Sequence, residues 1–239
     1  MGFFNFKNME HCLGNCVGCL KVNYSLFSDL TEKELESLNM ERNKLFFKKG
    51  DSIFLEGAMP IGLYCLNHGK VKMIKKGKIE DEFIVSLHKP VDFLGFDNLM
   101  SNSPYTYTAV AIEDVSICII KKENLFSVIE KNVDLGKKII NYLSQKLIDQ
   151  NERMLVLTQT KMESRLAYTL IELINFYGYD IDGKTIAVEL KRKELASLSS
   201  MNTANVIRIL SAFNKQKIVK TKLRKIQILN LQSLKQIVE

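Results

Sequence analysis

Five cysteines are the residues of this chain best suited to chemistry, and three of them are crowded near its start. Cys12, Cys16 and Cys19 lie within eight residues, whereas Cys65 and Cys118 stand alone inside apolar, strand-like runs. In a reducing compartment such a cluster is not a disulfide framework, and closely spaced thiolates are typical metal ligands. The spacing therefore predicts a metal site near the N-terminus, and Cys65 is expected to be a core residue.

Positive charge is concentrated at the other end of the chain. The 239 residues carry a net charge of +7, and residues 161–239 alone hold 14 Lys and Arg against 7 Asp and Glu, so all of the excess lies there. Between Lys191 and Lys225 ten basic residues accompany a single acidic one, Glu194. Charge this localised indicates a polyanionic partner, of which nucleic acid is the commonest.

The composition is that of a globular protein. Apolar residues make up 46% of the chain, and its 12 glycines and 3 prolines are few, which excludes disordered and collagen-like classes. The longest apolar runs are too short to span a bilayer, and the first residues match neither a secretory signal nor a myristoylation site. We expect a cytoplasmic protein with no membrane partner.

Short strands are expected to dominate the first half. The sequence Thr31-Glu32-Lys33-Glu34 is a capping-box pattern that begins a short helix. After it, short apolar runs alternate with glycine and charge, with no helices expected between them. The expected strands are Lys44–Phe47, Ser52–Leu55, Leu63–Leu66, Lys70–Ile74, Glu82–Leu87, Thr106–Ala111 and Val115–Ile120. This pattern predicts an antiparallel sandwich or barrel.

A long helix is expected after Asn132. Its heptad core positions are Ile140, Leu143, Leu147, Gln150, Met154 and Leu157. A helix of about 25 residues with such a narrow apolar seam is typical of a two-stranded coiled coil, so these residues are predicted to mediate dimerisation. The alternative is an amphipathic helix that lies on the sandwich. A second, more apolar helix is expected over 165–177.

The basic C-terminal end contains a helix-turn-helix pattern. A helix over 191–198, a turn over 199–201 and a helix over 202–213 with Asn202 as N-cap are followed by two strands, 218–220 and 226–229. The second helix would pack Val206, Ile209, Leu210 and Phe213 inward and present Thr203, Ala204, Ile207 and Arg208 outward. Outward residues near the start of such a helix reach base edges. The basic residues 221–225 between the strands are similar to the wing of a winged helix.

In this order the elements resemble the CRP/FNR family of bacterial transcription regulators. Residues 47–57 and 62–72 resemble the two signature hairpins of its sensory domain, and 192–196 with 206–210 resemble its helix-turn-helix. The resemblance implies an α+β fold with an N-terminal jelly-roll β-sandwich like a cyclic-nucleotide-binding domain, a long dimerisation helix and a C-terminal winged helix-turn-helix. The expected divisions are a cysteine-rich segment 1–28, a sensory domain 29–131, a dimerisation helix 132–160 and a DNA-binding domain 161–239.

Cyclic AMP is not the expected effector. Cyclic-nucleotide-binding members use a Gly-Glu pair for the ribose and an Arg-Ser pair for the phosphate, because a buried phosphodiester needs a fixed cationic fork. Here the first pair is replaced by Gly95-Phe96, and no arginine occurs from Asn43 to Glu152.

The segment Gly95–Leu99 resembles instead the FNR branch, whose oxygen-labile iron–sulfur cluster is held by N-terminal cysteines and one late-strand cysteine. The resemblance implies a [4Fe–4S] cluster on Cys12, Cys16, Cys19 and Cys118. The usual Cys-x2-Cys-x5-Cys pattern is broken, because Ser25 occupies its third position and Cys12 must supply the missing thiolate. A zinc site that includes His11, unligated thiols, and a regulator that senses haem or a metabolite remain alternatives.

The same resemblance implies a homodimer that binds an inverted repeat in promoter DNA and works with RNA polymerase. The implied DNA-contacting residues are Lys191, Arg192, Asn202, Thr203, Ala204, Asn205, Ile207, Arg208, Lys222, Arg224 and Lys225. Arg208 is expected to read guanine, whereas Ala204 and Ile207 replace the glutamate and serine of the FNR pattern and favour thymine methyl groups. The expected site is therefore richer in A·T than the usual FNR site.

An enzymatic alternative starts from the same cysteines. Cys12-x3-Cys16-x2-Cys19 is also the spacing of radical SAM enzymes, but their chemistry is housed in a repeated βα barrel, which this pattern of short strands does not match. The chain has no phosphate-binding glycine loop and no His-Glu-x-x-His motif. It is not expected to be an enzyme.

Overall fold

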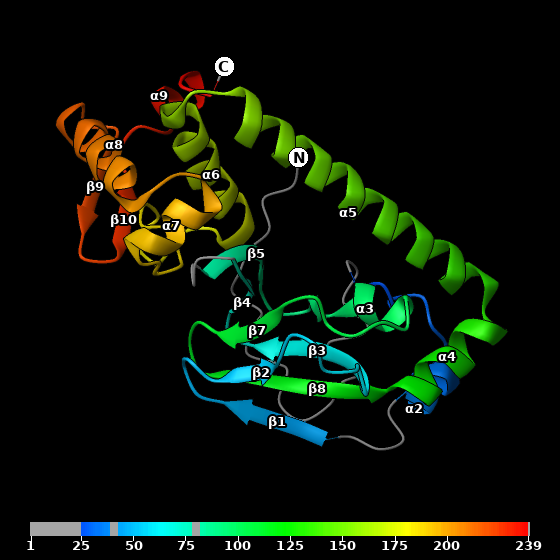
Figure 1. The fold of residues 1–239 in the computed structure, drawn as a ribbon. Coiled ribbons are helices and arrows are strands. Elements are labelled where there is room, and N and C mark those ends of the chain that lie inside the picture. Colours follow the sequence, from blue (N-terminus) through cyan, green and yellow to red (C-terminus); the bar gives the residue numbers. More distant parts are fainter. Residues whose placement is uncertain (1–24, 39–42, 78–81, 239) are drawn as a thin grey trace. The chain divides into compact units, whose positions relative to one another are not determined.

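The computed structural model of the chain describes residues 25–38, 43–77 and 82–238. Cys12, Cys16 and Cys19 lie outside these residues. The chain divides into two compact units (Figure 1), one of residues up to Lys75 with Val85–Lys146, and one of Lys76–Ile84 with Leu147–Glu239. The long helix α5, Val133–Gln159, contributes its first half to one unit and its second half to the other.

The first unit is built on two four-stranded antiparallel sheets, as the alternating apolar pattern predicts. One sheet has the order β1-β8-β3-β6 and the other β2-β7-β4-β5. The strands are β1 Asn43–Phe47, β2 Ser52–Phe54, β3 Gly62–His68, β4 Val71–Lys76, β5 Glu82–His88, β6 Phe93–Leu94, β7 Thr108–Ala111 and β8 Val115–Lys121. Side chains such as Tyr64, Leu66 and Met73 fill the core between the sheets. The seven strands expected from sequence are all present.

Helices cover the outer face of the β1-β8-β3-β6 sheet. They are α2 Glu32–Leu38, α4 Lys122–Lys131 and the start of α5, and they pack on Leu63 and Phe93 of the sheet. The predicted capping box of α2 is confirmed, because the Glu34 amide donates to Thr31 Oγ1 at 3.3 Å and the Thr31 amide donates to Glu34 Oε2 at 2.8 Å. The side chains between these helices and the sheet form a second core, called the outer core below.

The expectation that no helix interrupts the strands is wrong. Helix α3, Phe96–Met100, lies between β6 and β7 and begins at Gly95, whose φ is 68°. A Cβ at Gly95 would lie 2.4 Å from Cε1 of Tyr105, so the left-handed turn and the close approach both require glycine. A five-residue helix is too short to show a helical period in the sequence.

The second unit contains the predicted helical pair and strand pair. Its elements after α5 are α6 Met162–Tyr177, α7 Arg192–Leu198, α8 Thr203–Lys215, β9 Val219–Lys222, β10 Lys225–Ile228 and α9 Leu231–Gln236. Helix α6 ends at Gly178, as expected, with φ of 73°. The five-residue wing loop expected over 221–225 is wrong in length: β9 and β10 pair up to Lys222 and Lys225, which leaves Leu223 and Arg224 as a two-residue turn.

Among the described residues no helix is both long and apolar enough to cross a membrane.

Candidate metal centre and nucleic-acid interface

Cys118 lies in a row of four residues that crosses the β1-β8-β3-β6 sheet. Strand pairing places Lys44 opposite Cys118, Cys118 opposite Cys65, and Cys65 opposite Phe93. Residues opposite one another on neighbouring strands point to the same face of a sheet. Since Cys65 and Phe93 pack on the outer core under the helices, Cys118 also belongs to that outer face. Neither thiol is fully buried.

The described residues that follow the N-terminal cysteines pack on this same face. Leu26, Phe27 and Leu30 belong to the outer core, and the Phe27 ring meets the edge of the Phe93 ring with centroids 5.2 Å apart. Phe27 is eight positions after Cys19 in the sequence, a length of chain that spans at most about 29 Å. The donor set and this attachment point fit a thiolate-ligated metal group that joins the N-terminal segment to the sheet at Cys118.

Ser25, which stands at the third cysteine position of the FNR pattern, is buried. Its side chain accepts a hydrogen bond from the Phe27 amide at 3.3 Å, and its carbonyl accepts one from the Ser28 amide at 3.1 Å. The hydroxyl therefore shapes the turn that begins the outer core. Within the described ranges no three His, Cys, Asp or Glu side chains are grouped for a metal, so the predicted ligands Cys12, Cys16 and Cys19 stay a prediction.

Aromatic rings surround Gly95, with Phe54 and Tyr105 in the core between the sheets and Phe96 in the outer core. Tyr105 is 3% exposed and stacks on Phe54 with ring centroids 3.8 Å apart. Phe96, which replaces the ribose-binding glutamate, is also 3% exposed and packs against Phe93 and Tyr142. Burial raises the pKa of the Tyr105 hydroxyl well above its usual range. The region offers apolar surface instead of the charged groups that a cyclic phosphate requires.

The helix-turn-helix has the predicted inward face, and three of the four residues predicted to face outward are exposed. Val206, Ile209, Leu210 and Phe213 are buried, while Ala204, Ile207 and Arg208 are exposed on α8. Asn202 is the N-cap, since its side chain accepts a hydrogen bond from the Asn205 amide at 2.8 Å. Thr203 and Asn205 are half-buried. The exposed surface at the start of α8 is therefore formed by Ala204, Ile207 and Arg208.

Two arginines outside the motif fix its turn. Arg165 of α6 donates to the Ser200 carbonyl at 2.9 Å and to the Leu157 carbonyl at 3.2 Å, and Arg153 of α5 donates to the Leu198 carbonyl at 3.2 Å. Burial lowers the pKa of the Arg153 guanidinium. The bonds to Leu198 and Ser200 satisfy carbonyls at the end of α7 and in the turn that follows, where Ser200 has a φ of 51°. Sequence reasoning missed both residues, because neither belongs to a local motif.

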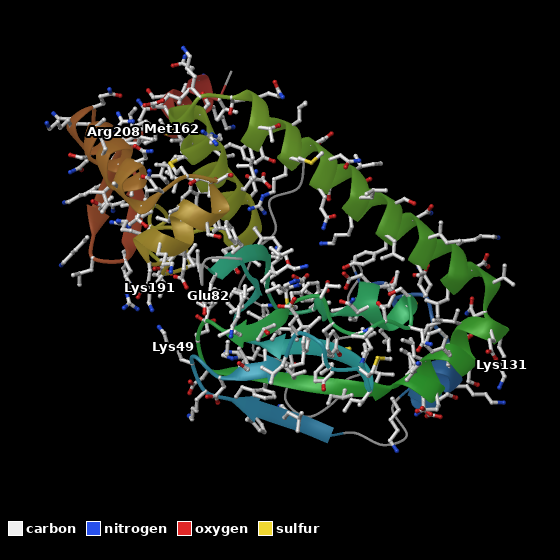
Figure 2. All side chains as sticks on the ribbon, viewed as in Figure 1. Lys49, Glu82, Lys131, Met162, Lys191 and Arg208 are labelled. Carbon is white, nitrogen blue, oxygen red and sulfur yellow. The ribbon has the colours of Figure 1, made fainter. Side chains whose placement is uncertain are left out.

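Arg208, the predicted guanine reader, forms an ion pair within this unit. Its Nη2 lies 3.6 Å from Oε1 of Glu163, which follows Met162 at the start of α6, and both side chains are about half exposed. Figure 2 labels Arg208 and Met162. An exposed pair of this kind contributes little to stability, so it holds the guanidinium without locking it in place. The sequence analysis did not identify Glu163 as a partner of Arg208.

The wing is held by one of the predicted DNA-contacting residues. Arg192 Nη2 donates to the Leu223 carbonyl at the tip of the turn at 3.1 Å, and burial lowers the pKa of its guanidinium. Lys225 Nζ lies 3.7 Å from Asp180 and 3.8 Å from Glu189. Lys191, Lys222 and Arg224 are exposed. The structure thus gives Arg192 and Lys225 contacts inside the unit and leaves the other three basic residues on its surface.

Leu223 occupies a strained position at the wing tip. Its φ is 52° and its side chain is 89% exposed, so an apolar residue takes a left-handed conformation without gaining burial. We expect Leu223→Gly to stabilise the protein by about 1 kcal/mol and raise the midpoint of thermal unfolding by about 2–4 °C. Leu223→Ala keeps the Cβ and should change the midpoint little. An unchanged or lower midpoint for the glycine variant would contradict the strain.

The predicted seam residues of α5 differ in their surroundings. Ile140, Leu147 and Met154 are exposed at intervals of seven residues, and Gln150 is exposed in the same stretch. Leu143 packs against the outer core of the first unit, and Leu157 is half-buried. Ile148 and Leu155, which the heptad analysis passed over, are 50% and 63% exposed. The exposed apolar stripe of α5 therefore consists of Val133, Ile140, Leu147, Ile148, Met154 and Leu155.

Comparisons with known proteins agree with both units. Residues 44–132 match the family model of the cyclic nucleotide-binding domain, and residues 164–237 match that of the Crp-like helix-turn-helix domain. The chain is similar to FixK2 from Bradyrhizobium japonicum, with a TM-score of 0.74 at 22% identity over 83% of this chain and 98% of that one. A CRP/FNR-family regulator from Thermus thermophilus gives a TM-score of 0.69 at 22% identity, with 82% and 98% covered. These structures support the fold.

Curated relatives point to one branch. The fumarate and nitrate reduction regulatory protein of Vibrio cholerae is 27% identical over 92% of this chain and 88% of its own length. The transcriptional activator protein Anr of Pseudomonas aeruginosa is 22% identical over 90% and 89%. These relatives are transcription regulators and not enzymes. With its sandwich, long helix and winged helix-turn-helix in this order, the chain belongs to the CRP/FNR family of transcription regulators, on the FNR-like branch.

Proposed function

We propose that this DNA-binding regulator senses oxygen or redox state through a [4Fe–4S] cluster held by Cys12, Cys16, Cys19 and Cys118. The observation that carries the proposal is the position of Cys118 on the sheet face where the chain that follows the other three cysteines packs. When bound, such a cluster supplies oxygen-labile redox chemistry. The four thiolates bind it, and the outer core orients the N-terminal segment toward Cys118.

The outer core also offers a route from this site to α5. Leu135 and Ile139 of α5 are buried in the same cluster of side chains as Phe27 and Leu30. Loss of the cluster would free the N-terminal segment, withdraw its support from this core and alter the start of α5. A change there biases the rest of a continuous helix, because packed helices shift as units.

Dimerisation through α5 is the second part of the proposal. The exposed apolar stripe defined above runs along one helix, and exposed apolar side chains at heptad spacing pack well against a second copy. Gln150 weakens such a seam and keeps the association adjustable. The two wing-bearing units of a dimer would then meet two half-sites about 34 Å apart.

Leu147→Glu tests the dimer. A carboxylate in the centre of the seam should weaken association by at least about 2 kcal/mol, roughly thirty-fold in Kd. Ile181→Glu makes the same kind of change at a fully exposed loop residue and should leave association unchanged. Sedimentation velocity of anaerobic protein measures both. A Leu147→Glu variant that sediments like the unaltered protein would exclude this seam.

Cyclic AMP is proposed to have no part in the regulation. Support comes from the stacked Phe54 and Tyr105 and from the buried Phe96. A ligand at a hundred times its Kd stabilises the folded state by about 2.7 kcal/mol and so raises the midpoint of thermal unfolding. Because we expect cyclic AMP not to bind, millimolar cyclic AMP should leave this midpoint unchanged. An increase of several degrees would show that the sandwich binds the nucleotide after all.

The regulator is proposed to act in the cytoplasm, at promoters, together with RNA polymerase. We retain 1–28, 29–131, 132–160 and 161–239 as the proposed segments for metal binding, sensing, dimerisation and DNA binding. Binding selection on random duplexes, with anaerobic and air-exposed protein in parallel, tests this function. We expect an inverted repeat from the anaerobic sample and a loss of affinity after air exposure. Equal binding by both samples would remove oxygen control but leave DNA binding intact.

A further inference from the structure

Cys65 and Cys118 are directly opposite each other on neighbouring antiparallel strands. The pairing of β3 with β8 runs without a shift from Gly62 opposite Lys121 to Leu66 opposite Ile117, and the two cysteines fall inside this regular stretch. A register change of one residue would place them on opposite faces of the sheet. The position makes the two thiols cross-strand neighbours, although sequence analysis assigned them unrelated roles.

The spacing of opposed strand residues suits a disulfide. Directly opposed residues have Cα atoms about 4.5–5.5 Å apart, and disulfides join Cα atoms about 4.4–6.8 Å apart. The Cβ atoms of such pairs are about 4.5–5.5 Å apart, while disulfides need about 3.5–4.5 Å. Closing the bond therefore takes a Cβ approach of about 1 Å, which small shifts of two twisted strands accommodate.

Both side chains are also reachable. Cys65 and Cys118 are half-buried thiols, in contrast to Leu63 and Ile117 beside them, which are 0% exposed. Access to solvent is the condition for exchange with a small thiol reagent. The pair thus combines proximity with accessibility.

We propose that Cys65 and Cys118 form a dithiol site that low-molecular-weight disulfides oxidise to a cross-strand disulfide. One thiolate attacks a sulfur of the disulfide, forms a mixed disulfide and releases one small thiolate. The second protein thiol then loses its proton, attacks the mixed disulfide and releases the other small thiolate. The two protein sulfurs are oxidised by two electrons, and the small disulfide is reduced to two thiols.

This site goes beyond the proposed cluster, which uses Cys118 but not Cys65. A Cys118 thiolate bound to iron is not available for exchange, so the disulfide forms in protein without the cluster. Once formed, it holds Cys118 out of the cluster site until a thiol reductant reopens it. Cys65 then regulates when the metal site can be refilled.

Peptide mapping of the full-length chain tests the proposal. Iron content is measured first on anaerobic protein, so that the proposed cluster is tested independently of the disulfide. The protein is then freed of metal with a chelator and reductant, exchanged into mixtures of reduced and oxidised glutathione, alkylated, denatured and digested with trypsin. Cleavage after Lys and Arg, except before Pro90, places Cys65 in peptide 50–70, Cys118 in peptide 79–121 and the other three cysteines in peptide 8–21.

We expect the cross-link of 50–70 with 79–121 to exceed that of 8–21 with 79–121 by about ten-fold, because opposed strands give the two thiols a high effective concentration. Cys65→Ser should abolish the cross-link and leave glutathione on peptide 79–121, and Cys118→Ser should leave it on peptide 50–70. In concentrated urea the preference should disappear. Glutathione on Cys118 without a cross-link in the folded, unaltered protein, or equal cross-linking to 8–21, would overturn the proposal.

Discussion

Replacing Cys118 with alanine is expected to abolish the brown colour of anaerobic protein, together with its bound iron. A [4Fe–4S] cluster would give a broad absorbance near about 400 nm from charge transfer between thiolates and iron, and three N-terminal thiolates alone would leave one of its irons without a protein ligand. Because Cys118 is half-buried on a sheet face, a methyl side chain is tolerated there and the sandwich should still fold. Absorbance and iron content are measured without exposure to oxygen.

Cys65→Ala is the matched control for this change. It removes a thiol from the opposed position on β3, with the same loss of volume, but it leaves the four proposed ligands intact. We expect it to keep the full iron content. If both variants lose iron equally, the sheet face is being disturbed as a whole, and if neither loses iron, Cys118 is not a ligand.

Arg208→Ala is expected to lose preference at one base pair in each half-site. A bidentate guanidinium contact to O6 and N7 of guanine gives about 1–3 kcal/mol of discrimination, which is up to about a hundred-fold in relative affinity. The exposed neighbours Ala204 and Ile207 are expected to pack on thymine methyl groups, so the remaining positions should be richer in A·T than the usual FNR site. Binding selection on random duplexes reads the change directly. Recovery of an unaltered FNR consensus would show that α8 reads other bases.

Lys222→Ala is the control for the Arg208→Ala variant. Lys222 is exposed on the wing strand, and a phosphate contact there would contribute affinity without sequence preference. Its loss should weaken binding to all sequences equally and reduce the slope of log affinity against log salt concentration by about one. Glu163→Gln separates the ion pair from the base contact, because it frees the Arg208 guanidinium from the carboxylate on α6 and should leave the selected sequence unaltered.

The parts of the fold with a strong period were predictable from the sequence. Short apolar runs such as Val115–Ile120, separated by glycine and charge, predicted the sandwich, and the 3.6-residue spacing of Val206, Ile209 and Phe213 predicted the buried face of α8. The residue type and position of Asn202 predicted its role as N-cap, which the structure confirms. The short α3 and the two-residue wing turn were missed, because they are too brief to carry a period.

The candidate sites were less predictable because they depend on pairing between distant segments. Nothing local connects Cys65 with Cys118, and only the β3–β8 register brings them opposite each other. Arg192 has the charge of a phosphate ligand, yet its guanidinium supports the Leu223 carbonyl at the wing tip. In the same way, Leu143 fits the heptad of a dimer seam but packs on the sandwich, while Ile148 and Leu155 remain exposed.

Iron and acid-labile sulfide, assayed on protein purified without oxygen, test the central claim most directly. A [4Fe–4S] cluster on Cys12, Cys16, Cys19 and Cys118 predicts about four of each per subunit, lost together on exposure to air. A colourless protein that contains about one zinc per subunit and no sulfide would contradict it.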